Sequence, residues 1–245
     1  MWDFLRSRPI CPVDEDHQKW VDGRFRWLQE QLGEQRPREV RVVLPTPEFF
    51  PDTYNGGLKD AQAILVRVAG YMNVDPARFK LFIYSESRLQ GMDRENGSAG
   101  LYLHEGGKDP NGKTLAAIGI ESSQLGDPLS LVATLAHEIG HEILIGQGRI
   151  TPDQPDHEPL TDLLTVFLGM GIFGGNATIR DRGWSSGGWA GWQTRRLGYL
   201  DQRTFGYALA RFAWTRGESS PSWIKSVRPD VRAPLKAGLR FLSGR

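Results

Sequence analysis

Five consecutive residues carry the clearest chemical signal in the chain. Residues 137 to 141 read His-Glu-Ile-Gly-His, in a sequence that has only 5 histidines. Residues four apart on a helix lie on one face, with Cβ atoms about 5–6 Å apart, so His137 and His141 can share one Zn²⁺ at about 2.0–2.1 Å each. Glu138 would project beside the metal, where a carboxylate can deprotonate a water molecule. The pattern therefore predicts a metal site with a general base next to it.

A catalytic zinc site also needs a third protein ligand and an open position for water. Candidate ligands follow within a short distance along the chain. His157 and Glu158 are adjacent, and Asp162 comes four positions after the glutamate, at the start of another predicted helix. The gap after His141 is long enough for a helix end, a turn and the entry to that helix.

The combination of His-Glu-x-x-His with a later Glu-x-x-x-Asp resembles the gluzincin metallopeptidases, over about residues 129–172. In that family the glutamate of the second motif is the third zinc ligand, and the aspartate one turn later hydrogen-bonds a ligand histidine. The resemblance implies that His137, His141 and Glu158 hold Zn²⁺ and that Asp162 orients a histidine. A ligand histidine needs its other ring nitrogen held in this way, because the partner fixes the tautomer and the direction of the ring.

One residue departs from the family pattern. Pro159 follows the proposed ligand directly and predicts a helix start there, which puts Glu158 at the N-cap position rather than inside the helix. Asp162 therefore stays open as an alternative third ligand, and so does His157.

The resemblance also implies a reaction, the hydrolysis of peptide bonds in a peptide or protein substrate. The metal would lower the pKa of its water toward about 7 and polarise the carbonyl, while Glu138 takes the proton and passes it to the leaving amine. Tyr199 and Tyr207 are candidate donors to the oxyanion, with packing in the core or on the surface as the alternative. The strand expected at 116–120 would pair with an extended peptide if it lies at a sheet edge, and is an ordinary structural strand if it is central.

A different class of function remains as the alternative, a zinc-stabilised binding or regulatory protein without turnover. Structural zinc sites are usually closed and rich in cysteine, whereas this chain has a single cysteine, Cys11. A purely structural site also has no need of Glu138. The sequence therefore favours the peptidase over the regulatory protein.

The elements that must position these residues are mostly helices. Apolar residues that recur every three to four positions, with capping residues at the ends, indicate helix. The predicted helices run from Asp14 to Gly33, over 58–72, from Asp127 to Gly146, from Pro159 onward, over 201–216 and over 228–245.

Short apolar runs between turn residues predict four strands, at 40–44, 81–84, 100–104 and 114–120, the last two forming a hairpin. We expect one α+β domain over 1–245, with helices and a small, mostly antiparallel sheet in 1–126 and the active-site helix with a helical half in 127–245. This order is similar to that of compact single-domain bacterial gluzincins, which implies a zincin-like fold.

Composition argues against several other classes. The formal net charge is +1, with 30 basic and 29 acidic residues, which disfavours nucleic acid as a partner. One cysteine makes no intramolecular disulfide. The longest uncharged run, 163–179, is short for a membrane span and contains four glycines (Gly169, Gly171, Gly174 and Gly175). No signal peptide is visible at the start, so we expect a cytoplasmic protein without membrane contact, whose oligomeric state the sequence leaves open.

Two further motifs have competing interpretations. Residues 169–174 spell Gly-x-Gly-x-x-Gly, but a dinucleotide site requires a strand before this motif, and a helix precedes it here, so we expect a helix end. The Trp- and Gly-rich stretch 183–192 predicts a loop that packs onto the helices, covers the substrate as a lid, or stacks on single-stranded nucleic acid.

Overall fold

The computed structural model describes residues 9–85, 100–108, 112, 114–177, 179–186, 189–196 and 199–244, and only the backbone within 179–196. The fold is α+β, as expected. The helices are α1 (Glu15–Leu32), α2 (Arg36–Glu39), α3 (Leu58–Tyr71), α4 (Pro128–His141), α5 (His157–Phe167), α6 (Gly171–Ala177), α7 (Gln202–Thr215) and α8 (Pro229–Ser243). The strands are β1 (Phe79–Tyr84), β2 (Gly100–Lys108), β3 (Thr114–Glu121), β4 (Ile179–Ser186) and β5 (Trp189–Arg196).

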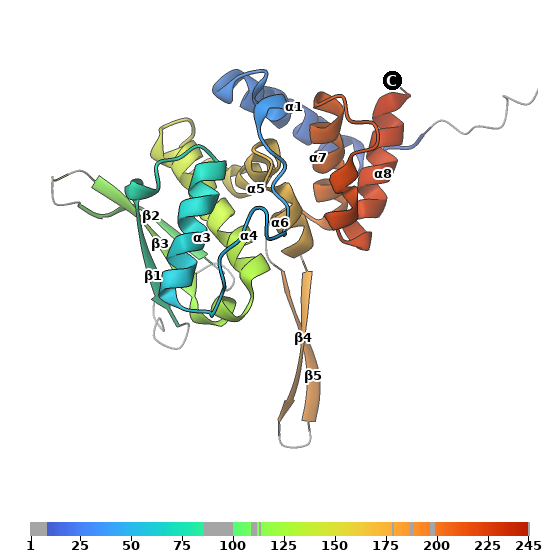
Figure 1. Ribbon diagram of the computed structural model, residues 1–245. Helices are drawn as coiled ribbons and strands as arrows, with labels where there is room; N and C mark the ends of the chain where they lie inside the picture. The colour runs from blue at the N-terminus through green and yellow to red at the C-terminus, as the bar shows by residue number, and fades with distance from the viewer. Residues whose placement is uncertain are drawn as a thin grey trace, which may run out of the picture.

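One hydrophobic core joins both halves of the chain. Strands β1 to β3 form a sheet on which α3 and α4 pack, and α5 and α6 lie against α4 (Figure 1). Beyond them α7 and α8 pack side by side in parallel, with Gly206 opposite Pro234 and Ala210 opposite Gly238. Helix α1 contacts both α5 and α7, so the first helix of the chain lies between elements from its second half. Helix α4 is central to this arrangement, since it touches the sheet on one side and α5 on the other.

The small sheet is mixed. Strands β2 and β3 pair antiparallel, which confirms the predicted hairpin, but β1 pairs with β3 in parallel, so the prediction of a mostly antiparallel sheet is wrong for that pair. The strand order is β1-β3-β2, which makes β3 central. The strand at 116–120 is therefore the structural strand of the two alternatives, and β2 is an edge strand that packs against α4.

Helix α1 has the boundaries that the sequence predicts. The Asp14 carboxylate accepts a hydrogen bond from the His17 backbone N–H at 2.9 Å, and the helix ends before Gly33, whose φ is +107°. A positive φ of this kind favours glycine because no Cβ has to be accommodated. The 58–72 helix and the 201–216 and 228–245 helices are likewise confirmed as α3, α7 and α8. Pro234 lies inside α8, and the helix continues through it.

The strand predicted at 40–44 is wrong. Its valines have high strand propensity, but the two buried ones, Val40 and Val43, are three positions apart, whereas the side chains of a strand alternate with a period of two. No strand of the described residues pairs with this segment. Instead, the Val43 N–H donates to the carbonyl of Gly169 at 3.0 Å, and the segment runs against the turn between α5 and α6.

That turn contains the first residue of the Gly-x-Gly-x-x-Gly motif, Gly169, and ends helix α5, as expected. Gly169 has a φ of +82°, and a Cβ there would lie 2.2 Å from the carbonyl oxygen of Arg41. The glycine therefore allows both the helix stop and the close approach of the neighbouring backbone.

Helix α4 begins as predicted, with Asp127 as N-cap and Pro128 in the first turn. After His141 the backbone continues as a π-helical turn over Glu142–Gly146, so the helical segment reaches the predicted end in a wider form. Helix α5 starts two residues earlier than predicted, at His157 with Asp156 as N-cap. Glu158 therefore lies in the first turn of the helix, and the prediction that it is the N-cap is wrong.

The predicted loop at 183–192 is wrong for its backbone. Strands β4 and β5 pair antiparallel from Ile179 opposite Arg196 to Ser186 opposite Trp189, and Figure 1 shows them extending away from the helices. The lid and stacking interpretations concern side chains outside the described ones. Across the described residues, every helix is too short or too polar to span a bilayer.

Candidate metal centre

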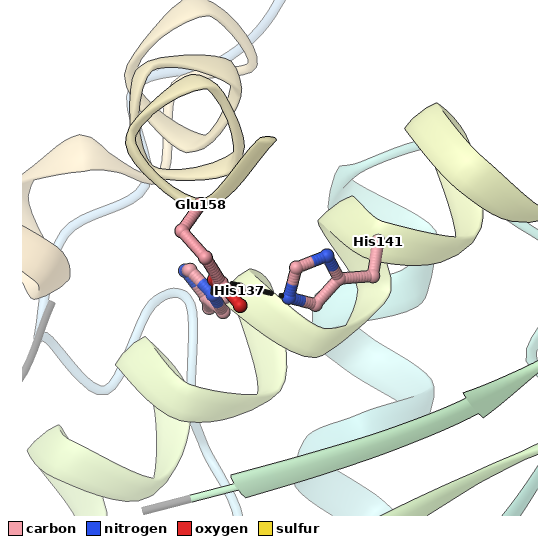
Figure 2. A group of neighbouring side chains, drawn as sticks. All are labelled: His137, His141 and Glu158. Carbon is pink, nitrogen blue, oxygen red and sulfur yellow. Dashed lines mark hydrogen bonds and ion pairs between the residues drawn. The ribbon is translucent and has the colours of Figure 1, made fainter. Parts of the chain in front are cut away.

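Three predicted ligands converge between α4 and α5. His137 and His141 point from one face of α4 toward Glu158, which reaches them from the first turn of α5 (Figure 2). The Glu158 Oε2 atom lies 2.9 Å from His137 Nε2 and 3.4 Å from His141 Nε2. The ligand atoms of all three residues lie within 4.8 Å of one another.

The two distances from Glu158 are close to those expected around a zinc ion. Atoms placed 2.0–2.1 Å from a zinc ion at tetrahedral angles lie about 3.4 Å apart. The contact between Glu158 and His141 already has this separation, and the contact between Glu158 and His137 is a few tenths of an ångström shorter because the pair is hydrogen-bonded. The donor set, two imidazoles and one carboxylate, is also that of catalytic rather than structural zinc sites.

A glycine brings the two helices close enough for this convergence. A Cβ on Gly140, the fourth residue of the His-Glu-Ile-Gly-His segment, would lie 2.8 Å from Thr161 Cγ2 of α5. Leu135 and Ile139 are fully buried and anchor α4 in the core. The segment thus combines two candidate metal ligands with the small residue that lets the third candidate approach.

Asp162 holds His137 from the side opposite Glu158. The Oδ1 atom of Asp162 lies 2.9 Å from His137 Nδ1. Its Oδ2 atom accepts hydrogen bonds from the backbone N–H groups of Tyr199 and Leu200, at 2.6 and 3.0 Å. Both oxygens of Asp162 are thereby engaged outside the converging cluster, so Asp162 contacts His137 from outside and Glu158 is the acid that could supply a third ligand atom.

His141 is held without a carboxylate. The Thr161 Oγ1 atom lies 3.4 Å from His141 Nδ1, and the same hydroxyl donates to the His157 carbonyl at 2.8 Å. Because its hydrogen is used there, Oγ1 is available as an acceptor, which leaves His141 Nε2 with a lone pair toward the cluster. The ring of Tyr102, from β2, lies 5.8 Å from the His141 ring at an interplanar angle of 30°.

His157 contributes to the surroundings of Glu158 rather than to the ligand set. Its Nδ1 donates to the Gln154 carbonyl at 2.9 Å, and its Nε2 lies 3.3 Å from Glu158 Oε1. This is the carboxylate oxygen that does not face the two ligand histidines. Among the described residues, the metal-competent cluster contains His137, His141 and Glu158 and leaves His157 outside.

Charge is concentrated on His137 and Glu158. Burial disfavours a charged imidazole, but hydrogen bonds with the Asp162 and Glu158 carboxylates outweigh it and raise the pKa of His137 well above its ordinary value. Both ring nitrogens face carboxylate oxygens, and only the doubly protonated ring donates from both. The pKa of Glu158 is far below its ordinary value, because the two histidines outweigh the effect of burial.

Glu138 lies on α4 between the two histidines in sequence and faces β2. It is buried, and a Cβ on Gly100, the first residue of β2, would lie 2.2 Å from Glu138 Oε1. Burial is the main cause that raises the pKa of this carboxyl group, and the two neighbouring histidines oppose the rise. The absence of a side chain at Gly100 therefore provides the space in which the carboxylate sits.

Of the two candidate tyrosines, only Tyr199 lies at the centre. Its ring stacks on His137, with centroids 5.7 Å apart and planes 22° apart, and 52% of the residue stays exposed. Burial, followed by the charge of Glu158, raises the pKa of Tyr199. Tyr207 is completely buried, and its hydroxyl donates to Asp22 Oδ1 at 3.0 Å, so it belongs to the core.

The sequence did not indicate a second buried cluster next to His141. Glu142, whose side chain is 1% exposed, pairs with Arg78, and the Tyr102 hydroxyl donates to its Oε2 atom at 2.6 Å. Burial and the hydrogen bond to Glu142 raise the pKa of Tyr102. The only available signal was the acidic residue directly after His141 in an otherwise apolar helix end.

Comparisons with protein-family models, with curated proteins and with solved structures found no match for this chain. The geometry of the site therefore carries the functional argument.

Proposed function

We propose that the protein is a zinc-dependent metallopeptidase of the gluzincin type. The main support for the proposal is the placement of two acidic residues of α5. Glu158 faces the two histidines, and Asp162, one turn later, bonds the opposite ring nitrogen of His137. These are the roles that the resemblance implies for the two residues. Because the three side chains come from two packed helices, they would bind one metal ion without movement of the helices.

Zinc held by His137, His141 and Glu158 would supply a water of lowered pKa and would polarise a bound carbonyl group. Glu138 is the residue of the chain that would move the proton. Its pKa is raised by burial, which brings the carboxyl group closer to the range in which it can take a proton and give it back. The leaving amine of a peptide bond needs such a proton before it departs.

Tyr199 is the residue we propose to stabilise the negative charge that develops on the carbonyl oxygen. Its ring stacks on His137, and its half-exposed position leaves it accessible to a substrate. A high pKa keeps the hydroxyl protonated at neutral pH, so that it remains a donor. Tyr199→Phe should lower turnover without loss of the metal.

For the peptide itself we propose β2 as the element of contact. It is an edge strand of the three-stranded sheet, and its first residue touches Glu138. An extended peptide that adds to a sheet edge is bound through its backbone and is therefore recognised with little dependence on sequence. The peptide-binding role considered for 116–120 does not apply, because β3 is central.

Metal content and peptide hydrolysis of three proteins test the proposal. We expect the wild type to bind one zinc ion and to cleave members of a broad peptide library. Glu138→Gln should retain zinc and lose activity, because the amide cannot accept the proton, whereas His141→Ala should lose both. Wild-type protein that is fully loaded with zinc and cleaves nothing would contradict a peptidase and would favour a zinc-stabilised regulatory protein.

A further inference from the structure

The first turn of α5 is held by a residue cluster that the proposed reaction does not use. Asp156 accepts two hydrogen bonds from Arg24, Nε to Oδ2 and Nη2 to Oδ1, both at 2.7 Å. Trp20 Nε1 donates to Oδ2 and Gln154 Nε2 donates to Oδ1, both at 2.8 Å. Arg24 and Trp20 belong to α1, more than 130 positions earlier in the chain.

The position of Asp156 makes this arrangement unusual for the molecule. It is the N-cap residue of α5, yet its side chain accepts no hydrogen bond from the first turn of its own helix. The N-cap aspartates of α1, α4 and α7 (Asp14, Asp127 and Asp201) all do so. An N-cap carboxylate ordinarily stabilises its helix by such a bond. In α5 the carboxylate is used to bind α1 instead.

These hydrogen bonds hold Asp156, which lies two positions before Glu158. Arg24 forms a bidentate pair, which fixes the direction of a carboxylate as well as its distance. The side chains are partly buried, at 28% exposure for Arg24 and 23% for Asp156, so water screens the pair only in part. A shift of this turn would move the Glu158 carboxylate relative to the two ligands on α4.

The same two helices also touch at the other end of α5. The rings of Phe25 and Phe167 pack edge to face, with centroids 5.2 Å apart. Phe25 is completely buried and is part of the main core. The two helices therefore have an apolar contact that does not depend on the polar one, and this contact can hold α1 on α5 when the polar one is weakened.

We propose that Arg24 and Trp20 are positioning residues of the metal centre, which act through Asp156 to place the Glu158 carboxylate opposite His137 and His141. This inference rests on the proposed metal site and adds a part of the chain, α1, that contributes no ligand. The two hydrogen bonds from Arg24 set the orientation of the turn, and the hydrogen bond from the Trp20 indole constrains the Asp156 carboxylate from another side. An ordinary bond between two helices would stabilise the fold and leave the metal affinity unchanged.

The test uses Arg24→Lys, which replaces the bidentate fork by a single donor, and Trp20→Phe, which removes the indole N–H and keeps an apolar ring. Arg67→Lys is the matched control, because Arg67 of α3 pairs with Asp52 of the preceding segment at 2.7 Å, and neither residue is part of the candidate metal centre. Zinc affinity is measured by competition with a chromophoric chelator, the ligand geometry by the visible spectrum of the Co²⁺-loaded protein, and the stability by thermal unfolding of the metal-free protein.

We expect Arg24→Lys and Trp20→Phe to weaken zinc binding about 10-fold, the low end of what groups that orient ligands contribute. The Co²⁺ spectrum should change, while the metal-free proteins should melt no lower than Arg67→Lys. Unchanged affinity and spectrum in both variants would overturn the positioning role alone. A loss of zinc affinity that Arg67→Lys also shows would overturn the positioning role as well. Wild-type protein that binds neither metal would overturn the proposed function together with this inference.

Discussion

The two histidines lie on one face of α4 but have different side-chain surroundings. His137 lies between the carboxylates of Asp162 and Glu158, so hydrogen bonds to charged groups fix its ring. His141 lies beside a threonine hydroxyl and the ring of Tyr102, so a weak hydrogen bond and packing fix it. One helix face thus presents a histidine whose protonation is controlled by neighbouring carboxylates and a histidine whose orientation is controlled mainly by packing.

This difference predicts unequal effects when the supporting residues are changed. Asp162→Asn should have the largest effect, because the amide keeps the shape and removes the charge that orients His137. We expect zinc affinity to fall about 10- to 100-fold, the range for carboxylates that support ligand histidines. Competition titration with a chelator measures it. A loss of zinc affinity below about 3-fold would show that the hydrogen bonds from the Tyr199 and Leu200 N–H groups to residue 162, rather than its charge, set the orientation of His137.

The same variant should change the pH dependence. His137 has to lose a proton before it binds a metal, and its pKa is raised by Asp162 and Glu158, so zinc affinity of the wild type should increase as the pH rises. Removing the Asp162 charge removes one cause of the raised pKa, so the rise should occur at lower pH in Asp162→Asn. Identical profiles for the two proteins would mean that Asp162 does not control the protonation of His137.

Thr161→Val tests the weaker support of His141. Valine has nearly the same shape but provides no acceptor for the Nδ1 hydrogen, and it removes the side-chain donor to the His157 carbonyl. We expect a loss of zinc affinity of about 2- to 5-fold, smaller than for Asp162→Asn, because a bond to a neutral group is weaker than one to a charge. An effect equal to that of Asp162→Asn would remove the contrast between the two histidines.

Tyr102→Phe should have the smallest effect on the metal, since the ring next to His141 is retained. It removes the hydrogen bond to the buried Glu142 carboxylate, which is then left with Arg78. We expect the free energy of unfolding to fall by about 1.5–3 kcal/mol, the range for hydrogen bonds to charged groups. Zinc affinity should stay within about 2-fold of the wild type. Denaturant unfolding of the metal-free protein measures the first quantity. A loss of affinity larger than that of Thr161→Val would assign the Tyr102 hydroxyl a direct role at the centre.

The sequence predicted the elements that are specified locally. Helices α1 and α4 were predicted with their capping aspartates, because a cap, a periodic apolar face and a stop lie within a few turns. The His-Glu-x-x-His segment was predicted on its helix for the same reason. The 40–44 segment was misread because its valines favour strand, although no strand of the described residues pairs with it. The 183–192 stretch was misread because its glycines have low strand propensity.

Contacts between distant segments could not be predicted. The parallel pairing of β1 with β3, the approach of Tyr102 to His141 and the bonds from α1 to Asp156 all join residues far apart in the chain. Each depends on how whole elements pack, and local composition contains no trace of that. The resemblance to gluzincins pointed to Glu158 and Asp162, while the start of α5 at His157 rather than Pro159 became clear only from the structure.

The separation between α1 and Asp156 also bears on how the chain folds during synthesis. Trp20 lies 136 positions before its acceptor, and a loop of that length closes at a considerable entropic cost. Contacts between remote segments slow folding. The N–H groups that bond Asp162 belong to Tyr199 and Leu200, which are synthesised after Asp162. A nascent chain therefore exposes the paired imidazoles well before their acidic neighbours are fixed. We expect the metal to be acquired after release from the ribosome, by a chain that has already folded.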